Sequence, residues 1–240
     1  MKTFHFYLPF TSLLLLFVLN PLHSQQRIVN EKRPISSFSE LEIKSAFKVE
    51  LSQTMTDHLV LSAPEKLLPY MVTEVRNGTL VIQPKRTAYL KKLRWEEVNI
   101  IIPLVALTSI SQMGSGEVYS QDLLRSKFLR LNQSGSGRVF LRIKTHKTTI
   151  KNSGSGLIQL SGESQKLEAN LSGSGQLKLK TLTAKEGVFN VSGSGSVQTL
   201  CTHKLSAKVS GSGKIFYHGE PKEVINTKVS GSGLIQLAIK

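Results

Sequence analysis

The chain has 240 residues, 40% of them hydrophobic, which is enough to bury a core in one large or two small domains. It contains 31 Lys and Arg residues against 16 Asp and Glu residues, and the formal net charge of +15 favours an anionic partner. The single cysteine, Cys201, excludes an intramolecular disulfide and a metal site built from several cysteines.

Residues 1–24 have the features of a secretory signal peptide. A basic start at Lys2 precedes an unbroken apolar run over 13–19, which is too short to span a membrane as a helix. Asn20-Pro21 ends the run, and Ser24 is a small residue of the kind found at cleavage sites. We therefore expect an exported chain, which argues against a nucleic-acid partner. We also expect no transmembrane segment in the mature protein, because no second run of about 20 apolar residues follows.

Residues 25–109 are expected to form a β-rich N-terminal part with irregular coils. Short runs such as 41–43 alternate apolar with polar side chains, as half-buried strands do. Two further strands are predicted at 72–76 and 79–83. Asn77-Gly78 joins them, and this dipeptide is typical of the tight turn of a β-hairpin because both residues tolerate positive φ.

A basic segment follows the predicted hairpin, with five cations in ten residues: Lys85, Arg86, Lys91, Lys92 and Arg94. Leu90, Leu93 and Glu97 fall at helical spacing, so we expect a short amphipathic helix or a mobile loop. The segment is the candidate for binding an anionic surface. The alternative is a solvated loop whose lysines keep their charged ends in water.

Residues 110–240 are organised by the triplet Gly-Ser-Gly, which occurs seven times at steps of 21, 19, 19, 20, 18 and 20 residues. A near-constant period of this length is typical of a solenoid, in which each repeat forms one coil stacked on the previous one. We expect the triplets to be the corners, because glycine adopts backbone angles forbidden to other residues. The corner glycines are Gly114, Gly116, Gly135, Gly137, Gly154, Gly156, Gly173, Gly175, Gly193, Gly195, Gly211, Gly213, Gly231 and Gly233.

Alternating apolar residues flank every triplet and predict the strands of the coils. Four residues after the first glycine the side chain is always aliphatic: Val118, Val139, Ile158, Leu177, Val197, Ile215 and Ile235. The predicted fold is therefore all-β, a parallel β-helix or solenoid with coils of about 20 residues, which we expect to be right-handed. A flexible Gly/Ser linker would not be interleaved with strands. A calcium-binding β-roll would need an Asp in each turn, and the triplets have none.

The position two residues before each first glycine should face inward. It carries amides in the first three repeats and aliphatic side chains in the last four: Gln112, Gln133 and Asn152, then Leu171, Val191, Val209 and Val229. We predict a buried amide ladder in the first three coils, because stacked amides can bond their copies above and below and so avoid the cost of burial.

No residue set in the sequence specifies catalysis, a metal site or a cofactor. Glycoside hydrolysis needs two carboxylates flanking one bond, and the only adjacent acids, Glu96-Glu97, would point to opposite faces of a strand. Cys201 and His203 could share a strand face but have no third ligand nearby. The serines lie in no Gly-x-Ser-x-Gly elbow. We therefore name no catalytic or metal-binding residue and expect no cofactor.

The final stretch, 233–240, is predicted to be an apolar strand whose edge invites another chain. We expect it to meet a second copy of the chain or another partner, which would make the protein a homo-oligomer through its C-terminal coil.

The chain resembles the family described as putative auto-transporter adhesin, head GIN domain. The resemblance rests on the signal peptide, on the segments 47–53, 63–70 and 77–80, and on the Gly-Ser-Gly coils that follow them. It implies an adhesin-like β-helical protein exported to the periplasm or cell surface of a Gram-negative bacterium, and it carries over no site residues. The function we expect is a non-enzymatic binding or structural module whose partner is an anionic glycan or another envelope protein. The alternative is a carbohydrate-active β-helix enzyme acting on an acidic glycan.

Overall fold

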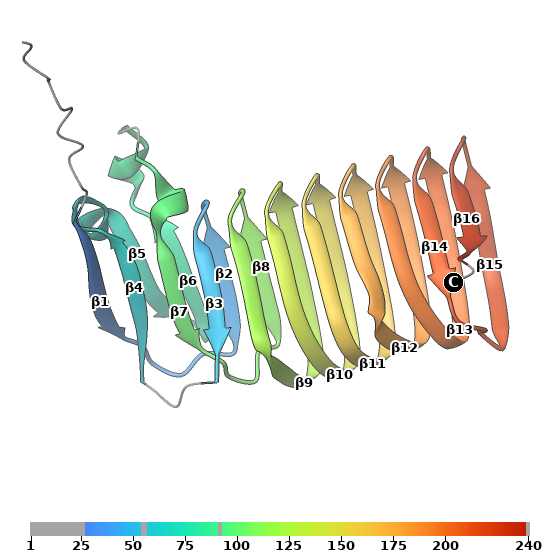
Figure 1. Ribbon diagram of the computed structural model, residues 1–240, viewed down its shortest axis with the longest axis horizontal. Helices are drawn as coiled ribbons and strands as arrows, with labels where there is room; N and C mark the ends of the chain where they lie inside the picture. Colours follow the sequence, from blue (N-terminus) through green and yellow to red (C-terminus); the bar gives the residue numbers. More distant parts are fainter. Residues whose placement is uncertain (1–26, 54–56, 91–92, 239–240) are drawn as a thin grey trace, which may run out of the picture.

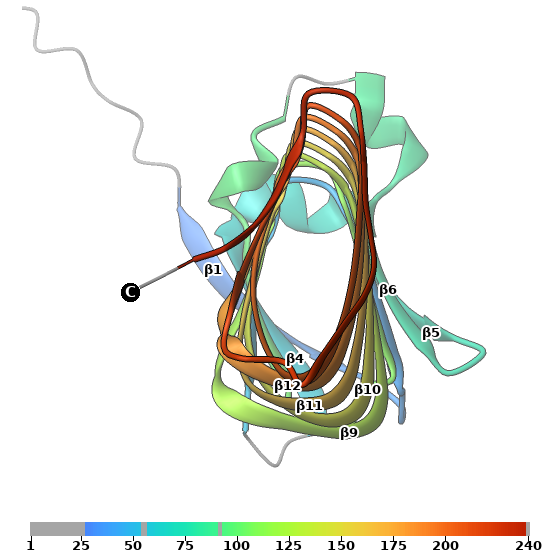
Figure 2. The same ribbon diagram turned by 90° about the vertical axis from the view of Figure 1, so that its right-hand side faces the viewer.

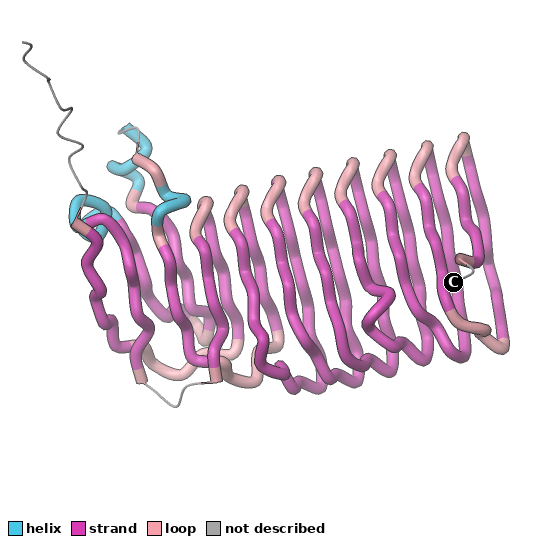
Figure 3. The backbone as a smooth tube through the Cα atoms, in the orientation of Figure 1, coloured by secondary structure: helices cyan, strands magenta, loops and turns pink. Residues whose placement is uncertain are grey.

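The computed structural model describes residues 27–53, 57–90 and 93–238, so the predicted signal peptide lies outside the described residues. The described chain is all-β and forms one long sheet that is wound into a solenoid (Figure 1). Its only helices are three short 3₁₀ segments at the N-terminal end: η1 (Glu65–Tyr70), η2 (Arg86–Leu90) and η3 (Trp95–Glu97) (Figure 3). Within these residues no helix has the length and apolar character needed to cross a membrane.

Eight strands make up the N-terminal part and the entry to the repeats. They are β1 (Ile28–Pro34), β2 (Glu40–Lys44), β3 (Lys48–Ser52), β4 (His58–Pro64), β5 (Met71–Arg76), β6 (Thr79–Pro84), β7 (Asn99–Pro103) and β8 (Ser109–Met113). β2 pairs in parallel with β8, and β3 pairs in parallel with β9, so the regular coils continue directly into this part. At the far end β1 pairs antiparallel with β4.

The regular coils follow as long strands that bend around the edge opposite the triplets. They are β9 (Glu117–Gly135), β10 (Arg138–Gly154), β11 (Leu157–Gly173), β12 (Gln176–Gly193) and β13 (Ser196–Gly211), and the last coils hold β14 (Lys214–His218), β15 (Glu223–Ser230) and β16 (Leu234–Leu237). The sequence predicts a strand on each side of every triplet. In β9 to β13 the strand after one triplet and the strand before the next are one continuous element.

The cross-section of the solenoid is flattened, with two long faces joined at the upper edge by the triplets and at the lower edge by the bends (Figure 2). From the C-terminal end the chain runs down the side that carries β16, across the lower edge and up the side that carries β15, while it advances toward the viewer. This path is a right-handed coil, as expected.

The triplets lie on a common edge, which confirms the predicted corners. Gly135, Gly154 and Gly173 are paired in register between neighbouring coils, as are the glycines that follow. The first glycine of each triplet has φ between 105° and 120°, where side chains are strained. Stacking adds a second requirement, because a Cβ on Gly173 would lie 2.7 Å from the carbonyl oxygen of Gly154.

Unequal coil lengths produce the irregularities of the ladder. β10 and β11 come from coils of equal length and pair without any shift. Between β9 and β10 the two extra residues of the 21-residue coil are absorbed between Tyr119 and Leu123. Between β11 and β12 the one extra residue is absorbed after Lys178. These adjustments fall in the strand half after a triplet and leave the triplets in register.

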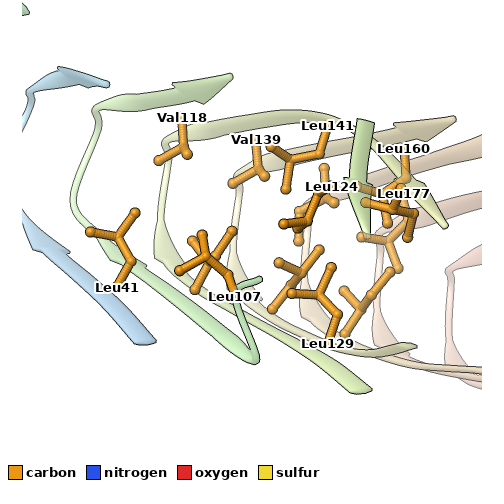
Figure 4. Packing of buried hydrophobic residues seen from close by; sticks show 14 of the residues in the cluster. Leu41, Leu107, Val118, Leu124, Leu129, Val139, Leu141, Leu160 and Leu177 are labelled. Atoms are coloured by element: carbon orange, nitrogen blue, oxygen red, sulfur yellow. The ribbon is translucent and has the colours of Figure 1, made fainter. Parts of the chain in front are cut away.

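The core fills the inside of the coil with aliphatic side chains from both faces. Val118, Val139 and Leu177 are at most 2% exposed and project into the interior, as the alternation predicts (Figure 4). The last coil differs, because it is packed on one side only. Val229 was expected to face inward, and it is 42% exposed, as is Leu237 in the same coil.

The predicted hairpin is confirmed, since β5 and β6 pair antiparallel around Asn77 and Gly78, with φ of 50° and 77°. The basic segment contains η2 and lies between β6 and η3, so it is neither one amphipathic helix nor a loop throughout. Another corner has no glycine triplet. Ser45 has φ of 150° and donates its backbone N–H to Met113 O, directly beside Gly114.

Candidate functional site

The three predicted inward amides are buried. Gln112, Gln133 and Asn152 are 1–2% exposed and occupy the same position in successive coils. Gln133 Nε2 donates to Gln112 Oε1 at 3.0 Å, whereas Asn152 Nδ2 donates to the carbonyl oxygen of Gly156 at 3.1 Å. The hydrogen-bonded ladder therefore joins Gln112 to Gln133 but does not continue to Asn152, whose side chain is one methylene shorter. Gln133 Oε1 and Asn152 Oδ1 have no hydrogen-bond partner among the described residues.

This inward row explains the second glycine of every triplet after the first. A Cβ on Gly156 would lie 2.6 Å from Cδ of Gln133, and one on Gly195 would lie 2.6 Å from Cδ2 of Leu171. The inward side chain of an earlier coil therefore occupies the space that a side chain at the corner would need. The amides together with Leu171, Val191 and Val209 support the corners from inside and are not accessible to a ligand.

Three of the five cations predicted as an anion-binding surface lie within the described residues, and these three do not form one free cluster. Lys85 and Arg86 are exposed, but the Arg94 guanidinium lies 3.1 Å from Glu96 and 3.2 Å from Glu97. Hydrogen bonding to Glu96 raises the pKa of Arg94. Lys91 and Lys92 lie outside the described residues.

The upper part of the face that leads into the triplets carries a different, regular surface. An exposed serine precedes six of the triplets and another forms the centre of all seven: Ser134, Ser153, Ser172, Ser192, Ser210 and Ser230, with Ser115, Ser136, Ser155, Ser174, Ser194, Ser212 and Ser232. Beside them runs a row of amides and cations: Asn132, Lys151, Asn170, Asn190, Lys208 and Lys228. We call these three rows the serine edge.

The serine edge combines hydrogen-bonding groups with positive charge. None of its residues is acidic, and Lys151, Lys208 and Lys228 are exposed and form no ion pair among the described residues. Asn190 Nδ2 donates to Asn170 Oδ1 at 3.0 Å, which aligns the amides along the axis. A groove of about 410 Å³ runs between the row of amides and cations and the row of serines that precede the triplets, from Asn170 and Ser172 to Lys228 and Ser230. The rows repeat at the strand spacing of about 4.8 Å.

Most of the acidic residues in the repeats form ion pairs between coils. Five glutamates lie within 3.4 Å of a cation: Glu117 with Arg138, Glu163 with Lys144, Glu168 with Lys147, Glu186 with Lys166 and Glu223 with Lys204. Asp122 Oδ2 accepts a hydrogen bond of 2.7 Å from the backbone N–H of Gln53. These carboxylates hold neighbouring coils together, and nothing arranges two of them around a substrate bond.

The remaining candidate groups do not form a chemical site. Cys201 is fully buried, and burial raises the pKa of its thiol to about 11. His203 is half-buried, and nowhere in the described residues do three His, Cys, Asp or Glu side chains gather as they would around a metal ion.

Sequence reasoning missed two surfaces that the fold assembles. The serine edge is visible in the sequence as a serine before six triplets, but its significance depends on the register of the coils. The second surface surrounds Phe128, which is 58% exposed at the lower edge. The sequence offers no signal for it, because the coils switch their inward and outward alternation at the lower bend, and Phe128 occupies the position that Lys147 and Lys166 hold in the next two coils.

The sequence and the fold of this chain are similar to those of known proteins. Residues 37–221 match the sequence profile of the family described as "Putative auto-transporter adhesin, head GIN domain". A crystal structure of a putative adhesin from Bacteroides fragilis NCTC 9343 is 21% identical with a TM-score of 0.79, over 89% of this chain and 98% of that one. A putative lipid binding protein from Parabacteroides distasonis ATCC 8503 is 25% identical with a TM-score of 0.70, over 90% and 98%.

A putative adhesin from the same Parabacteroides strain is 18% identical, with a TM-score of 0.73 over 89% of this chain and 98% of that one. A comparison with curated proteins found no match. The two structures below 25% identity establish the fold alone.

Proposed function

Because the chain belongs to the family described as putative auto-transporter adhesin, head GIN domain, we propose that it is an exported, non-enzymatic, adhesin-like binding module. The ligand class we propose is an acidic glycan of the cell envelope or of a surface that the bacterium meets. The serine edge binds this polymer along the solenoid axis, with hydroxyl and amide groups meeting sugar hydroxyls and lysines meeting acid groups.

One observation carries this proposal: the serine edge has three uncompensated lysines and no carboxylate. Elsewhere on the coils most acids are paired with a cation of the neighbouring coil, so they are not available to neutralise the lysines of the serine edge. Along the serine edge the charge of Lys151, Lys208 and Lys228 is unbalanced and would attract an anion. The flat, regular rows suit an extended polymer better than a compact molecule.

The alternative of a carbohydrate-active enzyme finds less support. Such an enzyme needs a pair of free carboxylates with different pKa values on either side of a groove. The groove of the serine edge is lined by Asn, Ser and Lys residues together with the aliphatic residues between them. Binding without turnover is therefore the expected behaviour.

A glycan array combined with turnover assays tests the proposal. The purified chain should retain acidic glycans in a salt-sensitive manner and leave their length unchanged. The triple variant K151A/K208A/K228A should lose this retention. The matched control K178A/K180A/K185A removes the same charge from exposed lysines outside the serine edge and should bind as wild type. Depolymerisation of any glycan, or equal loss in both triple variants, would contradict the proposal.

Lipid is a second candidate ligand. The relative from Parabacteroides distasonis that is 25% identical carries the description "putative lipid binding protein". In this chain the exposed ring of Phe128, at the lower edge of the coils, is the feature that favours a lipid.

The basic segment stays a weaker proposal for an anionic surface, carried by Lys85 and Arg86, since Arg94 is neutralised. Self-association through the last coil is also proposed. Four large hydrophobic residues there are 39–47% exposed: Val224, Val229, Leu234 and Leu237. Light scattering over a range of concentrations should show a dimer that V224S/L237S disrupts, and a strict monomer at high concentration would contradict this assembly.

A further inference from the structure

The lower edge of the first regular coil protrudes from the solenoid. Figure 2 shows the bend of β9 extending below and beside the bends of the later coils. The cause is the length of this coil, whose two extra residues are absorbed between Tyr119 and Leu123 instead of at the triplet. The segment that follows, 125–128, pairs in register with β10 and lies at the edge opposite the serine edge.

An exposed aromatic ring lies on this protrusion. Phe128 is 58% exposed, the highest value among the large hydrophobic side chains of the described residues. Its ring meets His146 of the next coil edge-on, with centroids 6.4 Å apart and an interplanar angle of 78°. His146 contacts one side of the ring. The rest of the ring's apolar surface is exposed to water, which is energetically unfavourable.

Cations surround the ring. Phe128, Arg125, Lys127, Lys144 and His146 line a shallow hollow of about 770 Å³, and none of the residues lining it is acidic. Lys144 is compensated by Glu163, with Nζ 3.0 Å from the carboxylate. Arg125 and Lys127 are exposed and have no carboxylate partner among the described residues. The protrusion therefore presents one apolar ring with two free positive charges beside it.

We infer that this protrusion docks the protein onto an anionic lipid surface, with Phe128 entering the headgroup and acyl boundary while Arg125 and Lys127 contact phosphate groups. An aromatic side chain flanked by cations suits that boundary, because its ring leaves water while the charges remain at the headgroups. A convex edge can reach a flat membrane, whereas a glycan chain is better held by the flat rows of the serine edge. The inference deepens the second candidate function above and is independent of glycan binding.

Vesicle flotation tests this surface. The purified chain should float with vesicles made of equal parts phosphatidylcholine and phosphatidylglycerol, and should not float with phosphatidylcholine alone. Binding should weaken by about tenfold or more in R125A/K127A, because each cation near an anionic surface contributes appreciably. F128A should weaken binding by a similar factor, through lost apolar burial. Circular dichroism of each variant should show an unchanged fold, since all three residues are exposed.

Controls separate the membrane from other sources of phosphate and from the serine edge. K178A/K180A removes two exposed lysines from the same strand half of a later coil and should bind vesicles as wild type. K151A/K208A/K228A should also retain vesicle binding even if it loses glycan binding. Failure of the wild type to bind anionic vesicles would overturn the inference. Binding that is abolished by free inorganic phosphate but unaffected by F128A would overturn it too, because it would indicate an anion site without membrane insertion.

Discussion

Gln133 donates a hydrogen bond from Nε2 to Oε1 of Gln112, one coil earlier, at 3.0 Å inside the core. Gln112 in turn donates from Nε2 to the carbonyl oxygen of Gly116. The same inward position carries Leu171 and Val191 in later coils, so an aliphatic side chain fits this part of the coil as well. The amide pair is therefore maintained by its own hydrogen bonds and not by a shape that only amides could fill.

The pair should behave as a coupled unit. Gln112→Leu should lower the free energy of unfolding by about 1–3 kcal/mol, because the buried donor of Gln133 loses its acceptor. The double variant Q112L/Q133L should recover most of that loss, since both polar groups are then removed. Urea denaturation of the two single variants and the double variant measures the coupling. Additive losses would show that the two amides do not depend on each other.

Corner glycines and corner serines should differ sharply in their tolerance to alanine. Gly173→Ala places a Cβ at φ of 105° and 2.7 Å from the carbonyl oxygen of Gly154, so a destabilisation of about 1–3 kcal/mol or more is expected. Ser174 is exposed, and Ser174→Ala should change stability by no more than about 0.5 kcal/mol. Thermal unfolding followed by circular dichroism compares the two. Equal effects would argue against backbone strain as the reason for glycine.

Phe47 and Phe128 give a matched comparison of a buried and an exposed ring. Phe47 is fully buried and meets Trp95 edge-on at 5.7 Å, so Phe47→Ala should cost about 3–5 kcal/mol. Phe128→Ala should alter stability by about 0.5 kcal/mol at most. Because Trp95 is the sole tryptophan, its emission should shift to longer wavelength in the Phe47 variant and stay unchanged in the Phe128 variant.

The thiol of Cys201 should be unreactive in the folded protein. Burial raises its pKa from 9.0 to about 11, so the reactive thiolate is scarce at pH 8. Since the folded-state pKa is the higher one, the stabilisation from the neutral thiol is present below pH 9 and is lost as the pH rises toward 11. Labelling with a thiol reagent should be slow at pH 8 and become rapid in urea. Fast labelling of the native protein at pH 8 would contradict the buried position.

The solenoid could be predicted because its specification is local. A glycine at Gly135 or Gly154 is required by the backbone angle of its own corner, so the spacing of the triplets translates directly into coils. The hairpin at Asn77-Gly78 is specified in the same way. The corner at Ser45 could not be predicted, because it has no glycine and depends on its contact with Met113 in the next coil.

The candidate surfaces were less predictable than the fold. The charge of Lys151 or Arg125 can be counted from the sequence, but whether a carboxylate neutralises it depends on the register between coils. Arg138 illustrates this, since it is paired with Glu117 of the preceding coil, 21 positions earlier in the chain. Phe128 could not be placed, because the alternation of inward and outward residues changes at the lower bend, between Leu124 and Leu129.

The extra residues of the two longer coils that hold β9 and β12 lie in the same half of the coil. The additional residues of β9 and β12 are accommodated between a triplet and the next bend, whereas Ser153, Ser172 and Ser192 remain in strict register. An insertion or deletion in that half-coil would thus reshape the contour of one margin and leave the spacing along the opposite margin unaltered. Descendants of this chain can consequently diversify one contact surface by changing loop length while conserving the periodicity of the other.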